Sequence, residues 1–383
     1  MKPPIPFETK LIASPGDYTP LREEDKVVGA FNPGVTSVKT AKGLETILYV
    51  RVAETPLKGK PGEVLLPFFH IPNKESSLLE IGYDVVGRTS LKKPIGKKEV
   101  TPKEGPVRLR HISLPRMAIL DENRNISERR QEPIIYPTWE YERFGIEDVR
   151  ITHFKDGRYF ITYSTPHRKF GVNSHILSTK NIKDLKNLER VTSDNTPRSE
   201  VRGKDVVLFP EKVPSPSTTE MTKKGEQLYA AFIRPNAFHD LSAPGVWISY
   251  SPDLVHWGQD HRLIVSQKGE VTGTGSPPVK RPYGWLAAYH ETTIVKGKPE
   301  YVTKLMTLDL KEPWKILTLS STLLEREDFR DILPKGGYVP NIVFTTGIIV
   351  DGGRTDIHNG IDDEWSTLKS FYTEDIDRFV NGK

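Results

Sequence analysis

Hydrophobic and polar positions along the chain mostly follow the pattern of β strands. Short runs of β-branched and aromatic residues are broken by Gly, Asp, Asn or Pro along nearly the whole length, which is typical of strands joined by turns. The 3.6-residue period of an amphipathic helix is clearest in two short stretches, 183–188 and 367–380. The pattern therefore predicts an all-β fold with a short C-terminal helix.

Five of the apolar runs resemble one another, since each opens with a turn, continues as a strand and ends in polar residues. They are Gly43–Ala53, Asp156–Ser164, Gly225–Pro235, Tyr283–Glu291 and Gly352–Asp362. The centres of the last four runs are about 60–70 residues apart, which suits one four-stranded blade each. Five such repeats around an axis predict a five-bladed β-propeller, and we expect it to form a single domain over residues 1–383.

The gap between the first two runs is longer than the others and predicts a long loop insertion after the first blade. Residues 54–145 contain this Pro/Lys-rich insertion, in which the densest basic stretch comprises Lys92, Lys93, Lys97, Lys98, Lys103, Arg108 and Arg110. This stretch has neither a helical period nor interleaved aromatic residues, so it does not indicate nucleic-acid binding. A solvated loop is the simplest interpretation, and an interface in a homo-oligomer is the alternative.

The composition excludes several kinds of chemistry. The 383 residues include no Cys, so the chain has no disulfides, no thiolate metal sites and no thiol nucleophile. The spacing of His and acidic residues matches no metal-binding motif. The first residues, MKPPIPFETK, lack the apolar segment of a secretory signal, and no apolar run is long enough to cross a bilayer. We therefore expect a cytoplasmic protein without membrane or nucleic-acid partners, whose net charge of +5 favours an anionic ligand.

The inner strands of a propeller converge on its central channel, so the polar residues that end the repeats are candidate site residues. They are Arg51, His167 or Arg168, Arg234, His290 and Asp363. Arg234 and His290 each follow an apolar run, and together such groups would form a phosphate site. Lys212, which follows Pro210 and Glu211, would by itself be a surface charge. Asp363 could bind sugar hydroxyls or cap a turn, and the Asn-Pro-Gly turn explains Asn32 without a ligand.

A carboxyl group in the channel is a candidate general acid, and Asp148 in the segment FGIEDVR is the one that we single out. Strand alternation would place Glu147 and Asp148 on opposite faces. The alternative is a loop carboxylate that pairs with Arg143 or Arg150.

Taken in order, a set of segments resembles glycoside hydrolase family 130 over about residues 30 to 365. They are Asn32-Pro33-Gly34, LYVRV, GIEDVR, GKDVVLFPEK, FIRP, WISYSPDLVHW, GTGSPPVK with GWLAAYH, TLDL, YVPNIVFTTG and NGIDD. The family resemblance implies a five-bladed propeller that acts as an inverting β-mannoside phosphorylase or, in fewer members, as a β-mannosidase.

The resemblance also implies roles for individual residues. Asp148 matches the family's general acid, whose proton is thought to pass through the 3-hydroxyl of the mannosyl unit. Asn32, Arg51 and Asp363 match positions that hold the mannosyl ring, and the phosphate ligands fall on Lys212, Arg234, His290 and Tyr301. The expected reaction joins a β-mannoside (a manno-oligosaccharide or a mannosyl-glucose) with inorganic phosphate to give α-mannose 1-phosphate. No cofactor is implied, because phosphate is a co-substrate.

The sequence departs from the family pattern at several positions. Val149 replaces a proline, Ile233 replaces a histidine and Glu291 replaces a glycine. These changes leave two alternatives open: a β-mannosidase, with Glu291 as an added acidic group, and a non-catalytic propeller that binds glycans. Because the expected phosphate cations are retained, phosphorolysis is favoured. The linkage, the acceptor sugar and the oligomeric state are not determined by these motifs.

Overall fold

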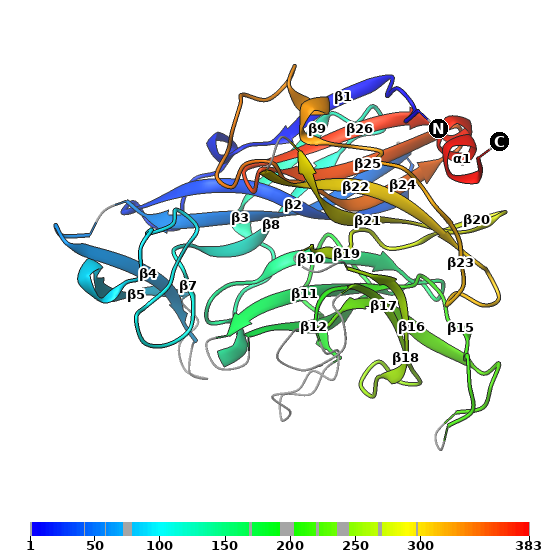
Figure 1. Ribbon diagram of the computed structural model, residues 1–383, viewed down its shortest axis with the longest axis horizontal. Helices are drawn as coiled ribbons and strands as arrows, with labels where there is room; N and C mark the ends of the chain where they lie inside the picture. The colour runs from blue at the N-terminus through cyan, green and yellow to red at the C-terminus, as the bar shows by residue number, and fades with distance from the viewer. Residues whose placement is uncertain are drawn as a thin grey trace.

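The computed structural model describes residues 2–382 except 42, 58, 72–78, 168–170, 192–202, 220–221, 236–244, 267–269 and 296–297. Five antiparallel sheets of four or five strands make up the body of the molecule (Figure 1). In the four sheets that come first along the chain, the earliest strand lies at one edge of the sheet and pairs with the next long strand. This arrangement confirms the predicted five-bladed propeller.

The blades follow one another along the chain. The first contains β2 (Asp25–Thr40), β3 (Gly43–Pro56), β8 (Ile112–Leu120) and β9 (Ile126–Pro133). The second contains β10 (Glu147–His153), β11 (Tyr159–His167), β12 (Gly171–Thr179) and β13 (Glu189–Arg190). The third contains β14 (Lys204–Leu208), β16 (Gln227–Arg234), β17 (Gly245–Ser251) and β18 (Gly258–Val265), with β15 (Val213–Pro214) beside β16.

The fourth blade contains β19 (Thr272–Thr274), β21 (Gly284–Val295), β22 (Lys298–Leu308) and β23 (Ile316–Leu319), with β20 (Val279–Arg281) beside β21. The fifth contains β24 (Val343–Asp351), β25 (Arg354–Ile361), β26 (Trp365–Tyr372) and, as its outer strand, β1 (Glu8–Ala13). Pairing of β1 with β26 joins the two ends of the chain in one sheet. It covers an edge of β26 that would otherwise be open to other strands.

Hydrophobic clusters fill the space between neighbouring blades. One cluster joins the first and second blades, and four others lie between the second and third, third and fourth, fourth and fifth, and fifth and first. Each sheet is thus covered on both faces, which explains why β3 is buried almost continuously from Ile47 to Ala53. These interfaces hold the inner strands around the channel.

The helix and turns refine the predicted elements. Helix α1 (Thr373–Asn381) packs Ile376, Phe379 and Val380 into the cluster between the fourth and fifth blades. The helical prediction for 367–372 was wrong, because these residues belong to β26. Residues 183–188 form no helix either, since a run of this length is too short to nucleate one. Among the described residues, four short 3-10 turns span Pro15–Asp17, Arg88–Ser90, Glu140–Glu142 and Arg326–Phe329.

The insertion lies inside the first blade, between its strands β3 and β8, and not after that blade as predicted. It is also more than a loop. Strands β4 (Glu63–His70) and β5 (Glu80–Gly87) form one ladder, and β6 (Glu99–Val100) and β7 (Arg108–Leu109) form another. The insertion projects from one side of the propeller, at the left of Figure 1. A small apolar cluster of its own, Val64, Leu66, Leu91 and Val100, stabilises it.

Candidate active site

Three inner strands each carry a polar residue whose backbone is in the left-handed region. In all three strands this residue lies at a shift in the strand register. Asn32 in β2, Asp148 in β10 and Asp205 in β14 have φ of 47°, 50° and 56°. Each lies where the register with the neighbouring strand shifts, as in a β-bulge. Asn and Asp tolerate this conformation better than other residues with a side chain. The bulges therefore direct polar side chains from three blades to a shared region.

Asn32, Arg51 and Asp148, which the sequence analysis placed in one site, do come together. Asn32 Nδ2 and Arg51 Nη1 each donate to Oδ1 of Asp148 at 2.9 Å. Arg51 Nη2 donates to Oε1 of Glu147 at 2.5 Å, and its Nε donates to Ser113 Oγ at 3.0 Å. One buried guanidinium thus holds two neighbouring carboxylates.

This arrangement corrects two sequence-based expectations. Glu147 and Asp148 do not point to opposite faces, because the positive φ of Asp148 interrupts the strand alternation. The alternative pairing of the Asp148 carboxylate with Arg143 or Arg150 is also wrong. Arg150 Nη1 donates to the backbone oxygen of Asp148 at 2.9 Å, and Arg143 pairs with Glu140.

The electrostatics of the Asp148 carboxyl favour its ionised form. Burial would raise its pKa, but the charges of Arg51 and Arg150, with the hydrogen bond from Asn32, hold the pKa well below its usual range. Burial likewise opposes ionisation of Glu147, yet the Arg51 charge lowers its pKa. In the ligand-free protein, Asp148 is therefore a carboxylate at neutral pH.

A second cluster gathers around Asp205. Arg234 Nε lies 2.9 Å from Asp205 Oδ2, and Arg234 Nη1 lies 3.4 Å from His290 Nε2. Burial and the nearby charges of Arg234, Lys204 and Arg150 lower the pKa of His290 well below its usual value, so its ring is neutral.

Lys204 belongs to this cluster, since it is paired in register with Arg234. The charge of Arg234, together with burial, lowers the pKa of Lys204 to about 8. Arg150 is buried, and its Nη2 has no hydrogen-bond partner among the described residues. The buried Arg150 and Arg234 and the half-buried Lys204 thus outnumber the Asp205 carboxylate, and such an excess of cations can hold an anion.

The structure does not bring Lys212 to this cluster. Its Nζ lies 4.5 Å from the ring centre of Tyr229, and Val213 beside it pairs with Leu228, at the opposite end of β16 from Arg234. Arg234 lies five positions after Tyr229, which corresponds to about 17 Å along a strand. Tyr301, in contrast, lies beside the cluster, with its ring centre 5.7 Å from that of His290.

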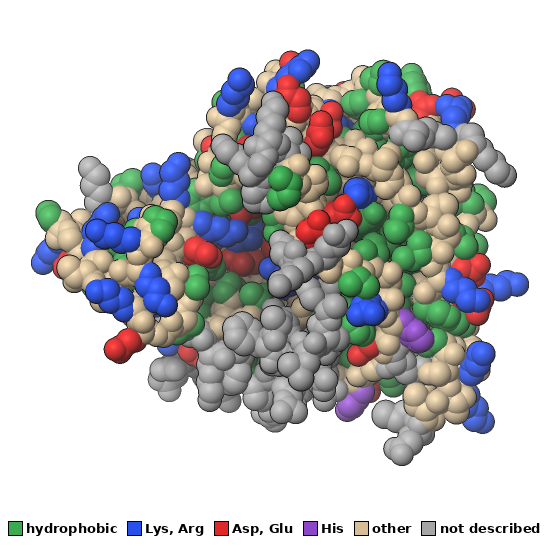
Figure 2. All heavy atoms as spheres, in the orientation of Figure 1, with side chains coloured by type: hydrophobic (Ala, Val, Ile, Leu, Met, Phe, Trp, Pro, Cys, Tyr) green, Lys and Arg blue, Asp and Glu red, His purple; other side chains and the backbone are tan. Residues whose placement is uncertain are grey.

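A cavity of about 320 Å³ is lined by residues of both the blades and the insertion. Its lining includes Arg51, Glu147, Asp148 and Lys204 from the blades and Lys98 from the insertion. Figure 2 shows acidic and basic side chains gathered in a recess beside the insertion. The interpretation of the basic stretch as a solvated loop is therefore wrong for Lys98, whose Nζ donates to Asp363 Oδ2 at 2.7 Å.

Sequence reasoning missed Lys98, His111, Arg150 and Lys204. Two of these residues could have been found from the motifs that contain them. Lys204 lies next to Asp205 in GKDVVLFPEK, and Arg150 is the last residue of GIEDVR. His167 lines the cavity, whereas Arg168 lies outside the described residues. Within the described ranges, no three His, Asp or Glu side chains form a group that could hold a metal ion. No helix there is long and apolar enough to cross a membrane.

The sequence model of the family described as beta-1,4-mannooligosaccharide phosphorylase, Glyco_hydro_130, matches residues 117–381. The chain belongs to glycoside hydrolase family 130. A beta-1,2-mannobiose phosphorylase of Listeria innocua is 31% identical over 361 residues, covering 93% of this chain and 92% of the relative. A 1,2-beta-oligomannan phosphorylase of Thermoanaerobacter sp. is 28% identical over 240 residues, covering 61% of this chain and 70% of the relative.

A solved structure of this family is also similar over nearly the whole chain. It is the beta-1,2-mannobiose phosphorylase of Listeria innocua in complex with beta-1,2-mannobiose, with a TM-score of 0.78, 28% identity and 97% coverage of both chains. The predicted family and the prediction of an enzyme are confirmed by these relatives, which are named mannoside phosphorylases.

Proposed function

We propose that the protein is an inverting phosphorylase that converts β-mannosides and inorganic phosphate into α-mannose 1-phosphate. The observation that carries this proposal is a cavity lined by the Asp148 carboxylate and the Lys204 ammonium, with the buried Arg150 acting on Asp148 and the buried Arg234 acting on Lys204 through their charges. A carboxyl group can protonate a leaving oxygen, and the cations can bind the phosphate that replaces it. The similarity to phosphorylases named for β-1,2-linked mannosides favours β-1,2-mannobiose as the first substrate to test.

In the proposed reaction, a phosphate oxygen attacks the anomeric carbon of the mannosyl unit from the face opposite the glycosidic oxygen. The new bond joins C1 to phosphate as the bond from C1 to the acceptor oxygen breaks, which inverts the configuration. The acceptor oxygen takes a proton that originates on Asp148 and passes through the 3-hydroxyl of the mannosyl unit. Asn32, Arg51 and Asp363 would hold that unit.

The ionised state of Asp148 places a condition on this mechanism. A general acid must carry a proton, whereas Arg51, Arg150 and Asn32 favour the carboxylate in the ligand-free protein. Binding of a phosphate dianion offsets the nearby cations, and a sugar excludes water from the carboxyl, so both raise its pKa. We therefore propose that Asp148 takes up its proton when the two substrates bind.

The position of Glu291 argues against hydrolysis. A hydrolase of this inverting type needs a carboxylate that activates water. Glu291 Oε1 accepts a hydrogen bond from Lys304 Nζ, and as the residue after His290 on β21 it points to the other face of the strand. Glu291 is thus directed away from the cluster that contains His290.

Incubation with β-1,2-mannobiose, with and without phosphate, tests the proposal. We expect α-mannose 1-phosphate, detected by its anomeric proton signal, only when phosphate is present. Asp148→Asn should lower turnover by about 10²–10⁴-fold, because it removes the acid, while the circular dichroism spectrum is unchanged. Release of mannose at the same rate without phosphate would indicate a mannosidase. Binding of mannobiose without turnover would indicate a glycan-binding propeller.

The remaining expectations stay predictions. They are the single-domain organisation, the cytoplasmic location, a homo-oligomeric assembly and the absence of a cofactor. The acceptor sugar is part of the same set, because manno-oligosaccharides and mannosyl-glucose both fit the family.

A further inference from the structure

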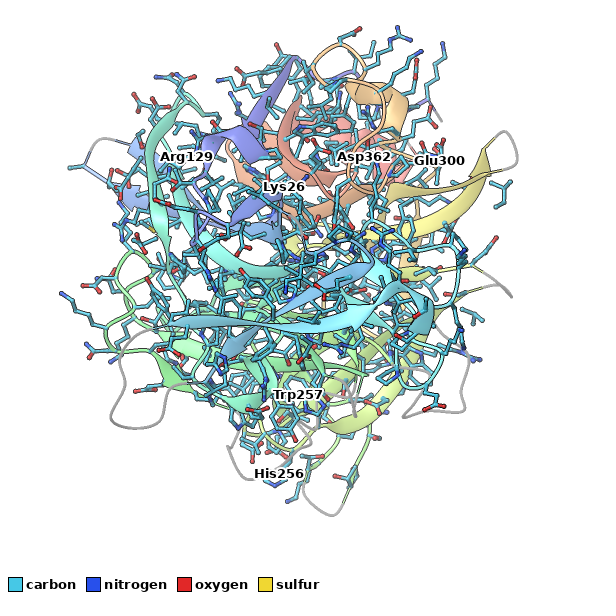
Figure 3. The ribbon with its side chains drawn as sticks, turned by 90° about the vertical axis from the view of Figure 1, so that its left-hand side faces the viewer. Lys26, Arg129, His256, Trp257, Glu300 and Asp362 are labelled. Carbon is cyan, nitrogen blue, oxygen red and sulfur yellow. The ribbon has the colours of Figure 1, made fainter. Side chains whose placement is uncertain are left out.

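The insertion contacts the segment that leads into the fifth blade. Tyr338 Oη donates to the backbone oxygen of Lys97 at 3.1 Å and lies 3.3 Å from His111 Nδ1. The backbone N–H of Arg110 donates to the oxygen of Lys98 at 2.9 Å. Figure 3, which faces the insertion, shows its strands in front of the propeller, with Asp362 labelled above them. The backbone around Lys98 is therefore held in place from two sides.

Asp362 and Asp363, which follow β25, have separate partners. The Asp362 carboxylate pairs with Arg326 at 2.6 Å and accepts the N–H of Ile342 at 3.1 Å, so it stabilises the turn itself. The Asp363 carboxylate instead accepts Lys98 Nζ, which comes from a segment 265 residues away in sequence. The Asp363 side chain is 8% exposed and that of Lys98 is 36% exposed. The pair therefore joins an almost buried carboxylate to an ammonium that still faces the cavity.

The surrounding charges favour this pair. Burial opposes the charge of Lys98, but the Asp363 carboxylate outweighs it and raises the pKa of Lys98. Asp363 also contributes to the field at Arg51, the residue that holds Asp148. Lys98 is thus electrostatically connected to the groups around Asp148, although it belongs to the insertion.

We propose that Lys98 is a binding residue of the mannosyl subsite that also positions the Asp363 carboxylate. Its ammonium occupies Oδ2 of Asp363 and leaves Oδ1 to accept a hydrogen bond from a mannosyl hydroxyl. The ammonium has three N–H donors, and the two that do not bind Asp363 can donate to hydroxyl oxygens of the same sugar. The insertion thereby supplies part of the sugar site. The inference rests on the proposed function, since it takes a β-mannoside as the ligand.

The test compares Lys98→Met with Lys97→Met, because Lys97 is the next residue on the same segment and its side chain is exposed. Initial rates of mannose 1-phosphate formation are measured with β-1,2-mannobiose varied at saturating phosphate, and then with phosphate varied. Lys98→Met should lower kcat/KM for mannobiose by about 10- to 100-fold, through the loss of charge-assisted hydrogen bonds. Its KM for phosphate should stay within about twofold, as expected for a group that acts on the sugar and not on the phosphate.

One further variant and two further measurements separate the outcomes. Lys98→Arg keeps the charge and should recover part of the mannobiose kcat/KM, and thermal melting should show all three variants folded. Equal mannobiose kinetics for Lys98→Met and Lys97→Met would overturn the inference, as would an equal rise in both KM values. If the native enzyme does not form mannose 1-phosphate, the proposed function fails. Calorimetric titration with mannobiose then decides on Lys98, and the inference fails if Lys98→Met binds as well as Lys97→Met or if nothing binds.

Discussion

The assignment of phosphate binding to Lys204 and not to Lys212 leads to a direct comparison of two substitutions. Lys204 lines the cavity with Asp148 and is paired in register with Arg234. Lys212 contacts the Tyr229 ring at the far end of the same strand. A charge-assisted hydrogen bond contributes about 1.5–3 kcal/mol. Lys204→Met should therefore raise the KM for phosphate roughly 10- to 100-fold, at about 1.4 kcal/mol for each factor of ten.

Lys212→Met should leave the KM for phosphate unchanged, because only its contact with the Tyr229 ring is lost. That contact contributes about 0.5–1 kcal/mol to stability. The assay is the initial rate of mannose 1-phosphate formation at saturating mannobiose with phosphate varied, and thermal melting controls for folding. An unchanged phosphate KM in Lys204→Met, or a raised one in Lys212→Met, would refute the assignment.

The pKa of Lys204 adds a second signature to the same comparison. Since that pKa is lowered to about 8 in the free protein, the side chain is charged below pH 8 and loses its charge above it. The value of kcat/KM for phosphate reports ionisation in the free enzyme, so it should fall as the pH rises through about 8. In Lys204→Arg this decline should be absent, because a guanidinium keeps its charge. An identical decline in both proteins would assign it to another group.

Two further predictions concern groups that support the site and the fold. Arg51→Met leaves the carboxylate of Glu147 buried without its guanidinium partner, so the free energy of unfolding should fall by about 3–5 kcal/mol in urea titrations. His358 is buried in the fifth blade, which lowers its pKa from 6.5 to about 4. Between these pH values the unfolded state binds a proton that the folded state does not, so acidification through this range should cost about 3 kcal/mol of stability. His358→Leu should remove that part of the decline.

Each of these predictions can fail clearly. Native-like stability of Arg51→Met would mean that the Glu147 carboxylate takes up a proton or becomes hydrated when Arg51 is lost. For His358, the comparison is between the stability curves of the two proteins from pH 7 to 4. Parallel curves would show that His358 is not protonated on unfolding and that other buried histidines, such as His175, account for the acid sensitivity.

Local patterns carried much of the correct prediction. The five similar runs became the β3, β11, β16, β21 and β25 strands, because a turn followed by alternating apolar residues specifies a strand without help from distant residues. The order of motifs along the chain indicated the family. Asn32, Arg51 and Asp148 were assigned together through that resemblance, and the structure places them in hydrogen-bond contact.

What local patterns could not predict is how side chains meet across the channel. The two lysines of GKDVVLFPEK look equivalent in sequence, yet the register with β16 places Lys204 beside Arg234 and Lys212 far from it. Strand alternation failed for Glu147 and Asp148, since a bulge rotates one residue. Lys98 reaches Asp363 across 265 residues of sequence.

The sequence by itself thus determined the strands, their repetition and the family, and it indicated residues for a candidate site. These features depend on turn residues and apolar spacing within short segments, where each blade is specified by its own residues. The tertiary structure alone decided which cations surround Asp148 and Asp205, and that the insertion enters the site. Such contacts depend on bulges, on strand register and on the closure of the ring of blades. These features bring together side chains that are far apart in sequence, and their separation in sequence does not predict their distance in space.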